Sequence, residues 1–197
     1  RFFREAETAG RLTHPNIVTI YDAGEEHDLA YIAMEFLKGK DLVPYVKQPN
    51  LLPAARVLSI VERVADALGY AHTMGVVHRD IKPANIMYEP ESDTAKVTDF
   101  GIARITDSSR TKTGMVLGPP SYLSPEQLAG NKTAGESDLY SLGVVGYHML
   151  CGELPFHASN TPSMLMKHIS ETPRPIREVR PDVPAWLELG GLWVTAA

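Results

Sequence analysis

The sequence predicts an α+β domain, because short extended runs gather in its first half and helical patterns dominate the rest of its 197 residues. Three observations carry this prediction. Residues from Pro53 to Met74 keep a 3.6-residue apolar period, and two pairs of short strand-like runs flank that segment. The stretch from Leu139 to Cys151 is apolar and reads as a buried helix. A domain of this length can bury one sizeable core.

The N-terminal region is predicted to hold one helix and one hairpin. A helix is expected at residues 1–12, where Glu5 lies among the polar positions and apolar side chains recur at helical spacing: Phe2, Phe3, Ala6, Ala9 and Leu12. Extended runs follow at Ile17–Tyr21 and Leu29–Phe36. Residues 24–28 have the composition of the turn between these two strands.

The later elements follow from periodicity and turn residues. Pro53 stands at the start of the long helix and Gly75 just past its end, as expected at helix boundaries. Residues 86–88 and 96–98 are predicted strands of a second hairpin, which would bring Asn85 and Asp99 together. Residues 102–123 are rich in Ser, Thr and Gly and are expected to form a loop, whereas residues 137–151 and 161–170 are expected to be helices.

Three short segments carry the strongest chemical signal. They are His78-Arg79-Asp80-Ile81-Lys82-Pro83-Ala84-Asn85, Asp99-Phe100-Gly101 and Ser124-Pro125-Glu126. Asp80 can accept a hydroxyl proton, and Lys82 can bring positive charge to a phosphate in flight. Asn85 and Asp99 offer the hard oxygen ligands that Mg²⁺ prefers. An isolated Asp or Asn near a turn more often caps that turn, but the three segments in this order fix about ten residue identities and favour phosphoryl transfer.

These motifs resemble those of the eukaryotic-like serine/threonine protein kinases, bacterial members in particular. The resemblance also covers residues 14–18, 31–36 and 137–143, and so extends over nearly the whole chain. It implies a two-lobed protein kinase fold. Residues 1–36 would be the end of the small N-lobe, and residues 37–187 a mostly helical C-lobe that carries the catalytic loop and activation segment. Residues 188–197 do not look like the family and form an atypical tail.

The resemblance implies how ATP would be bound. Backbone groups of Glu35 and Leu37 would hydrogen-bond adenine beside the gatekeeper Met34, and Lys82, Asn85 and Asp99 would hold the phosphates and the metal. Met87 would lie under the adenine ring, although a Met in a strand is ordinarily core.

Other residues would regulate the site. Glu5 matches the helix-C glutamate of the family. Arg79 would pair with phosphate on the activation loop, where Thr111 and Thr113 are the expected phosphorylation sites. Asp138 would support the catalytic-loop backbone from below, and Glu126 would close the activation segment.

The chain departs from the family at several points. It contains no G-x-G-x-x-G loop and no strand lysine of the V-A-I-K type for Glu5 to pair with. Pro119 stands where relatives usually have a Thr that bonds the catalytic Asp and Lys, so we expect Asp80 and Lys82 to be oriented less well. The Arg that normally pairs with Glu126 is missing, which would leave a buried carboxylate without an ionic partner unless the carboxylate is solvated or protonated.

Composition excludes several functions. The net charge of −5 argues against a nucleic-acid partner, and the single cysteine, Cys151, excludes a disulfide framework and reads as a small buried residue. No run reaches the roughly 18 apolar residues of a membrane span, and no signal peptide is recognisable at Arg1. His72, His148 and His168 lack the spacing of metal ligands and are expected to be surface or core residues.

The predicted function is therefore ATP-dependent phosphorylation of Ser or Thr in protein substrates, with Mg²⁺ or Mn²⁺ as the metal and a kinase homodimer as a further partner. The expected location is the cytoplasm, or the cytoplasmic part of a membrane-anchored kinase. Two alternatives stay open. A pseudokinase scaffold would bind partners without catalysis, and a gene remnant would not fold stably; circular dichroism and cooperative melting would identify the remnant.

Overall fold

The computed structural model describes residues 10–27, 29–100, 120–185 and 187, and these build the predicted α+β architecture. Its strands are β1 (Ile20–Glu26), β2 (Leu29–Met34), β3 (Lys40–Asp41), β4 (Ile86–Glu89) and β5 (Thr94–Val97). Its helices are α2 (Ala54–Thr73), α4 (Pro125–Leu128), α5 (Gly135–Cys151), α6 (Thr161–Ser170) and α7 (Ile176–Val179). Short 3₁₀ turns lie at Val43–Val46, Pro83–Asn85 and Pro120–Tyr122. Glu5 and the rest of the predicted N-terminal helix up to residue 9 lie outside the described residues.

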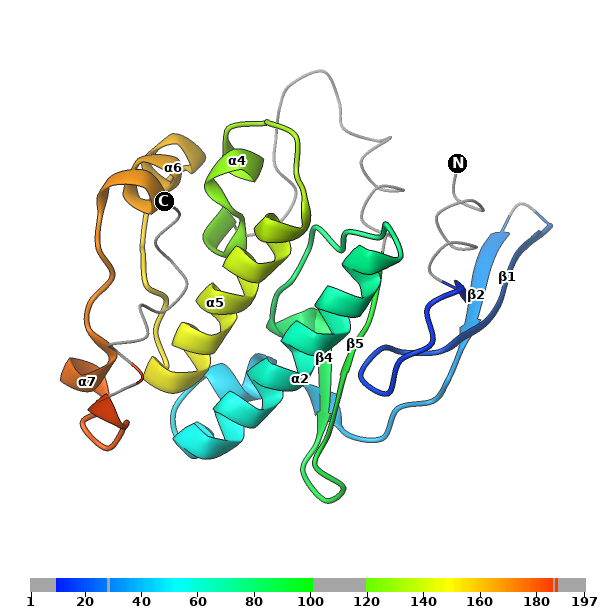
Figure 1. Ribbon diagram of the computed structural model, residues 1–197, viewed down its shortest axis with the longest axis horizontal. Coiled ribbons are helices and arrows are strands. Elements are labelled where there is room, and N and C mark those ends of the chain that lie inside the picture. Colours follow the sequence, from blue (N-terminus) through cyan, green and yellow to red (C-terminus); the bar gives the residue numbers. More distant parts are fainter. Residues whose placement is uncertain (1–9, 28, 101–119, 186, 188–197) are drawn as a thin grey trace.

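Helices α2 and α5 form the centre of the described structure, where they lie side by side (Figure 1). Helix α2 begins after Pro53 and ends at the Met74 cap, followed by Gly75 with a φ of +76°, which confirms the predicted helix. Its buried face carries Val57, Ile60, Val61, Val64, Ala67, Leu68 and Ala71. Helix α5 is buried over most of its length, as predicted for an apolar helix of the core.

The first hairpin differs from its predicted boundaries. Strand β1 runs on through Gly24, Glu25 and Glu26, which pair with residues 31, 30 and 29 of β2, although these residues were expected to form the turn. Backbone pairing therefore overrides the turn-forming composition of the segment. Ile17 and Val18 were expected to belong to this strand, but they instead contact Val97, through a parallel bridge at Ile17 and a 2.9 Å hydrogen bond from Val18 N to the Val97 carbonyl.

The second hairpin is confirmed, and its first strand directly follows the turn Pro83–Asn85. Strands β4 and β5 pair antiparallel, with Ile86 opposite Val97, and the two-residue strand β3 adds to the outer edge of β4. The sequence analysis did not predict β3, α4 or α7, which are all four residues or shorter. Figure 1 shows α4, α6 and α7 beyond α5, on the opposite side of the molecule from the β1–β2 hairpin.

Candidate active site

The loop after α2 is held from below by a buried carboxylate. Asp138, in the first turn of α5, is 1% exposed and accepts hydrogen bonds from the backbone N–H of His78 at 2.8 Å and of Arg79 at 2.7 Å. The His72 Nε2 atom lies 2.8 Å from the same carboxylate. Asp138 therefore occupies the supporting position that was expected of it, and His72 is a partner that the sequence analysis did not identify.

Asp80 lies at the centre of a compact polar cluster. The Lys82 ammonium donates to Asp80 Oδ2 at 2.7 Å, and Asn85 Nδ2 donates to the Asp80 carbonyl at 2.7 Å and to Oδ2 at 3.0 Å. Pro119 lies outside the described residues, but among those that are described Asp80 and Lys82 orient each other directly. The structure thus brings three predicted residues of the site together.

The β4–β5 hairpin brings Asn85 close to Asp99. Thr98 N donates to the Asn85 carbonyl at 2.9 Å, and Asp99 follows at once with an exposed side chain and a φ of +63°. Because Asn85 Nδ2 is used by Asp80, the amide oxygen Oδ1 is the atom left for a cation, and it has no hydrogen-bond partner among the described residues. An amide oxygen and a carboxylate suit Mg²⁺, which is usually held by few protein ligands.

His78 connects the loop that carries Asp80 to the segment that precedes Asp99. Its Nδ1 accepts from the Asp80 N–H at 3.2 Å, and its Nε2 lies 2.8 Å from the Thr98 carbonyl. These two partners require the neutral ring with its hydrogen on Nε2. The side of the imidazole packs against Phe100, with ring centroids 4.7 Å apart at 63°, and both residues are buried. The backbone around Asp80 is thereby tied to the backbone just before Asp99.

The predicted adenine-binding segment follows β2. Glu35 N donates to the Thr19 carbonyl at 2.9 Å, so the Glu35 carbonyl is the backbone group left for a ligand. Its side-chain Oε1 accepts from Thr19 N at 2.7 Å and from Lys96 Nζ at 2.6 Å. Burial acts to raise the pKa of the Glu35 carboxyl, but the hydrogen bonds from Lys96 and Thr19 outweigh it and hold the pKa below its usual value. Lys96 was not among the predicted site residues, although its place three residues before Asp99 could have drawn attention to it.

The remaining predicted positions have simpler surroundings. Met87 is partly buried between Asp41 and Lys96 in the three-stranded sheet, while Met34 is 40% exposed. Leu37 is partly exposed. Thr111 and Thr113 lie outside the described residues, so their phosphorylation and its pairing with Arg79 stay predictions.

Of the alternatives left open for Glu126, the structure shows the solvated one. The side chain is partly exposed, and its carboxylate accepts a hydrogen bond from the Ser137 hydroxyl. Burial acts to raise the pKa of Glu126, but the hydrogen bonds from Ser137, the Glu126 backbone and Ser124 together outweigh it, and the pKa lies below its usual value. A neutral hydroxyl at the start of α5 therefore contacts the carboxylate that an arginine was expected to meet.

The three helical histidines are not metal ligands in the described part of the chain, where no group of three or more His, Cys, Asp or Glu side chains could hold an ion. His148 Nδ1 lies 2.7 Å from the Tyr122 hydroxyl, and His168 Nδ1 contacts the Tyr140 hydroxyl. Burial lowers the pKa of both histidines to about 4. Both therefore stay neutral near pH 7; His168 is a core residue and His148 is partly exposed.

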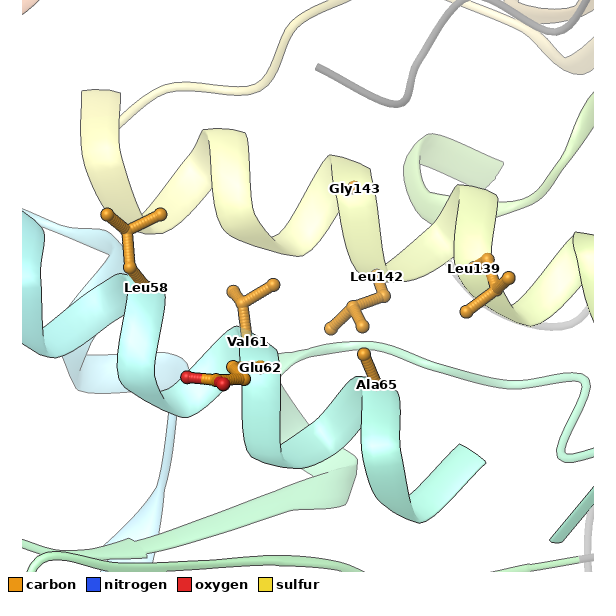
Figure 2. Close-up of a pocket in the computed structure, with 7 residues that line it drawn as sticks. All are labelled: Leu58, Val61, Glu62, Ala65, Leu139, Leu142 and Gly143. Carbon is orange, nitrogen blue, oxygen red and sulfur yellow. The ribbon is translucent and has the colours of Figure 1, made fainter. Parts of the chain in front are cut away.

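An apolar pocket lies away from this site. It occupies the groove between α2 and α5, and Figure 2 shows the side chains that line it. They are Leu58, Val61, Glu62, Ala65, Leu139, Leu142 and Gly143. The lining contains one ionisable side chain and none of the predicted catalytic residues, so the pocket offers no chemistry for phosphoryl transfer.

Comparisons with known proteins agree with the geometry. A protein kinase domain model matches residues 1–189. The chain is 46% identical to the serine/threonine-protein kinase pkn3 of Myxococcus xanthus, covering 92% of the chain and 35% of that protein. It is 44% identical to PrkC of Bacillus subtilis, covering 95% and 29%, and 42% identical to PknA of Mycobacterium tuberculosis, covering 93% and 43%. The chain therefore spans less than half the length of these relatives.

Solved structures show the same fold. The kinase domain of Mycobacterium tuberculosis PknI superposes with a TM-score of 0.74 at 32% identity, covering 100% of this chain and 70% of that one. Rad53 in complex with AMP-PNP superposes with a TM-score of 0.72 at 29% identity, covering 85% and 42%. The fold is that of a protein kinase domain. The named relatives are all kinases, so the comparisons give no support to the scaffold alternative. No helix in the described ranges has the length and apolarity needed to cross a membrane.

Proposed function

Because the chain belongs to the protein kinase domain family, we propose that it forms the catalytic part of a serine/threonine protein kinase, which transfers the γ-phosphate of ATP to Ser or Thr hydroxyls of proteins. One observation carries the proposal. The Asp80 carboxylate lies between the Lys82 ammonium and the Asn85 amide, on a loop connected through His78 to the backbone before Asp99. This supplies a proton acceptor, a positive charge and two metal ligands within one cluster.

In this proposal each side chain has one task. Asp80 orients the substrate hydroxyl and takes its proton, and Lys82, 2.7 Å from Asp80 Oδ2, brings positive charge to the transferred phosphoryl group. Asn85 Oδ1 and the Asp99 carboxylate hold Mg²⁺ or Mn²⁺. When bound, the metal neutralises the charge that develops on the phosphate oxygens.

The adenine end of the nucleotide would lie at the segment after β2. The Glu35 carbonyl and the Leu37 backbone would hydrogen-bond the base, and Met87 would provide an apolar contact below it. The Glu35 carbonyl suits this role because the Glu35 N–H is already bonded to Thr19. In domain terms, residues 1–36 end the N-lobe, residues 37–187 form the C-lobe, and residues 188–197 are a tail outside the kinase pattern.

The partners and location follow from the same proposal. The substrates are Ser- or Thr-containing proteins, a second copy of the kinase is the partner for autophosphorylation, and ATP places the reaction in the cytoplasm, on a soluble or a membrane-anchored protein. The catalytic test joins this chain to a kinase small lobe with a glycine-rich loop and strand lysine. Transfer of labelled γ-phosphate to a basic protein, abolished by Asp80→Asn, is the expected result. A fusion that melts cooperatively and binds Mg·ATP but transfers no phosphate would contradict the proposal and favour the scaffold.

A further inference from the structure

The side chain of Gln127 makes hydrogen bonds at both ends of its amide. Its Oε1 accepts from the Ser124 N–H at 3.1 Å and from the Ser124 hydroxyl at 3.2 Å, which is half of a capping box at the start of α4. Its Nε2 donates to the Arg79 carbonyl at 2.8 Å. Gln127 thus joins the end of the activation segment to the catalytic loop, across 48 residues of sequence.

The residue type is informative, because a capping box needs only an acceptor at this position. Glu serves that purpose as well as Gln does. Only Gln can accept from Ser124 and at the same time donate to a carbonyl on the far side. The helix cap does not use the Nε2 donor of Gln127, and the hydrogen bond to Arg79 therefore explains why the residue is Gln.

The carbonyl that Gln127 contacts belongs to a strained residue. Arg79 has a φ of +69°, in the left-handed region that residues other than glycine rarely adopt. Such a conformation persists only where the surroundings determine it. Here the Arg79 N–H is bonded to Asp138 of α5, and the Arg79 carbonyl is bonded to Gln127 of α4. Two helices from different parts of the chain therefore hold the two sides of this residue.

We propose that Gln127 is a positioning residue for Asp80, acting through the Arg79 backbone. Asp80 directly follows Arg79, so the direction of its carboxylate depends on the left-handed turn that Gln127 and Asp138 maintain. Gln127 itself touches no reacting atom. The inference rests on the proposed function for the role of Asp80, but the contact with Arg79 can be tested without any catalysis.

Three variants test the Oε1 acceptor and the Nε2 donor of the Gln127 side chain separately. Gln127→Glu keeps the acceptor for Ser124 but removes the donor and places a carboxylate oxygen against the Arg79 carbonyl. Gln127→Met removes both functions at nearly unchanged length. Ser124→Ala is the matched control, because it removes the hydroxyl of the cap and leaves the Gln127 amide in place.

The first experiment measures amide hydrogen exchange in the 197-residue chain. Loss of one hydrogen bond should raise the exchange rate of the Arg79 and Asp80 amides on the order of tenfold in Gln127→Glu and Gln127→Met. Ser124→Ala should raise exchange in α4 alone. Wild-type rates at Arg79 and Asp80 in both Gln127 variants, or an equal rise in Ser124→Ala, would overturn the proposal, as would a wild-type chain whose loop amides exchange without protection.

The second experiment measures kinetics in the chain joined to a kinase small lobe. Gln127→Glu should lower kcat by about tenfold or more and leave KM for ATP unchanged, whereas Ser124→Ala should change neither. A rise in KM with unchanged kcat would contradict a role in positioning Asp80. If the wild-type fusion transfers no phosphate while the exchange result holds, the proposed function fails and the Gln127–Arg79 contact stands.

Discussion

Acid should destabilise this domain through its buried histidines, and His168 allows the effect to be measured at one residue. Its side chain is 5% exposed, contacts the Tyr140 hydroxyl through Nδ1 and packs against Phe156, with ring centroids 4.9 Å apart. Its Nε2 has no hydrogen-bond partner among the described residues. Burial lowers the pKa of the imidazole from 6.5 to about 4, because the charged ring loses its contact with water there.

The sign of the effect follows from proton uptake. As pH falls through 6.5 the unfolded chain binds a proton at this histidine, whereas the folded chain stays neutral until pH is near 4. The folded state is therefore at its full stability above pH 6.5 and loses stability between pH 6.5 and pH 4. With these two pKa values, His168 should lower the free energy of unfolding by about 2 kcal/mol between pH 7 and pH 5.

His168→Phe should remove that loss. Urea unfolding monitored by circular dichroism at pH 7 and pH 5 should show the variant losing about 2 kcal/mol less than the wild type. At pH 7 the variant should be less stable than the wild type by about 1–3 kcal/mol, because it leaves the buried Tyr140 hydroxyl without its His168 Nδ1 partner. His148, whose pKa is also lowered to about 4, should account for a comparable loss that remains in the variant.

The control is His27→Gln, because the side chain of His27 is 89% exposed, and its pH dependence should match that of the wild type. The reasoning is wrong if His168→Phe loses as much stability between pH 7 and pH 5 as the wild type does. A cooperative urea transition in the wild type would also exclude a gene remnant that does not fold.

In the chain joined to a kinase small lobe, Asp80→Asn and Asp99→Asn should each lower phosphotransfer by several orders of magnitude, but only Asp99→Asn should strongly weaken Mg·ATP binding. Equal losses of affinity would contradict the assigned roles. Phosphopeptide mapping of the active fusion should find phosphate on Thr111 and Thr113, where Arg79 can meet it with charge-assisted hydrogen bonds, and unmodified threonines would refute this. The 197-residue chain alone should transfer phosphate far below the roughly 1–100 s⁻¹ typical of kinases, because nothing in its sequence covers the phosphates. Turnover in that range would show the glycine-rich loop to be dispensable.

The sequence predicted the elements that have a strong period or clear boundary residues. Helix α2 was predicted to within a residue at each end, because a long apolar face lies between Pro53 and Gly75. The end of β1 was not, because residues 24–26 have a turn composition and pair only through tertiary structure. Elements of four residues or fewer, such as α4, have too few positions to show a period.

The candidate site was predicted where one short motif contains the chemistry, as for Asp80, Lys82 and Asn85. The residues that hold this motif come from distant segments, and their sequence signal is weaker. Ser124 and Gln127 have the spacing of a capping box, so the part of Gln127 in the helix cap could have been predicted from the sequence. The contacts of Gln127 with Arg79 and of Lys96 with Glu35 depend on segments that meet only after folding.

The ion pair between Lys96 and Glu35 has a consequence for how the chain can vary in length. Lys96, which anchors the proposed adenine-binding segment, lies in β5, and Asp99, a proposed metal ligand, follows two residues after the end of that strand. In a strand, inserting or deleting one residue turns every later side chain to the opposite face. Within residues 96–99 an insertion or deletion should therefore be more damaging than a conservative substitution away from Lys96 and Asp99, because the shift would separate the two ends of the nucleotide site.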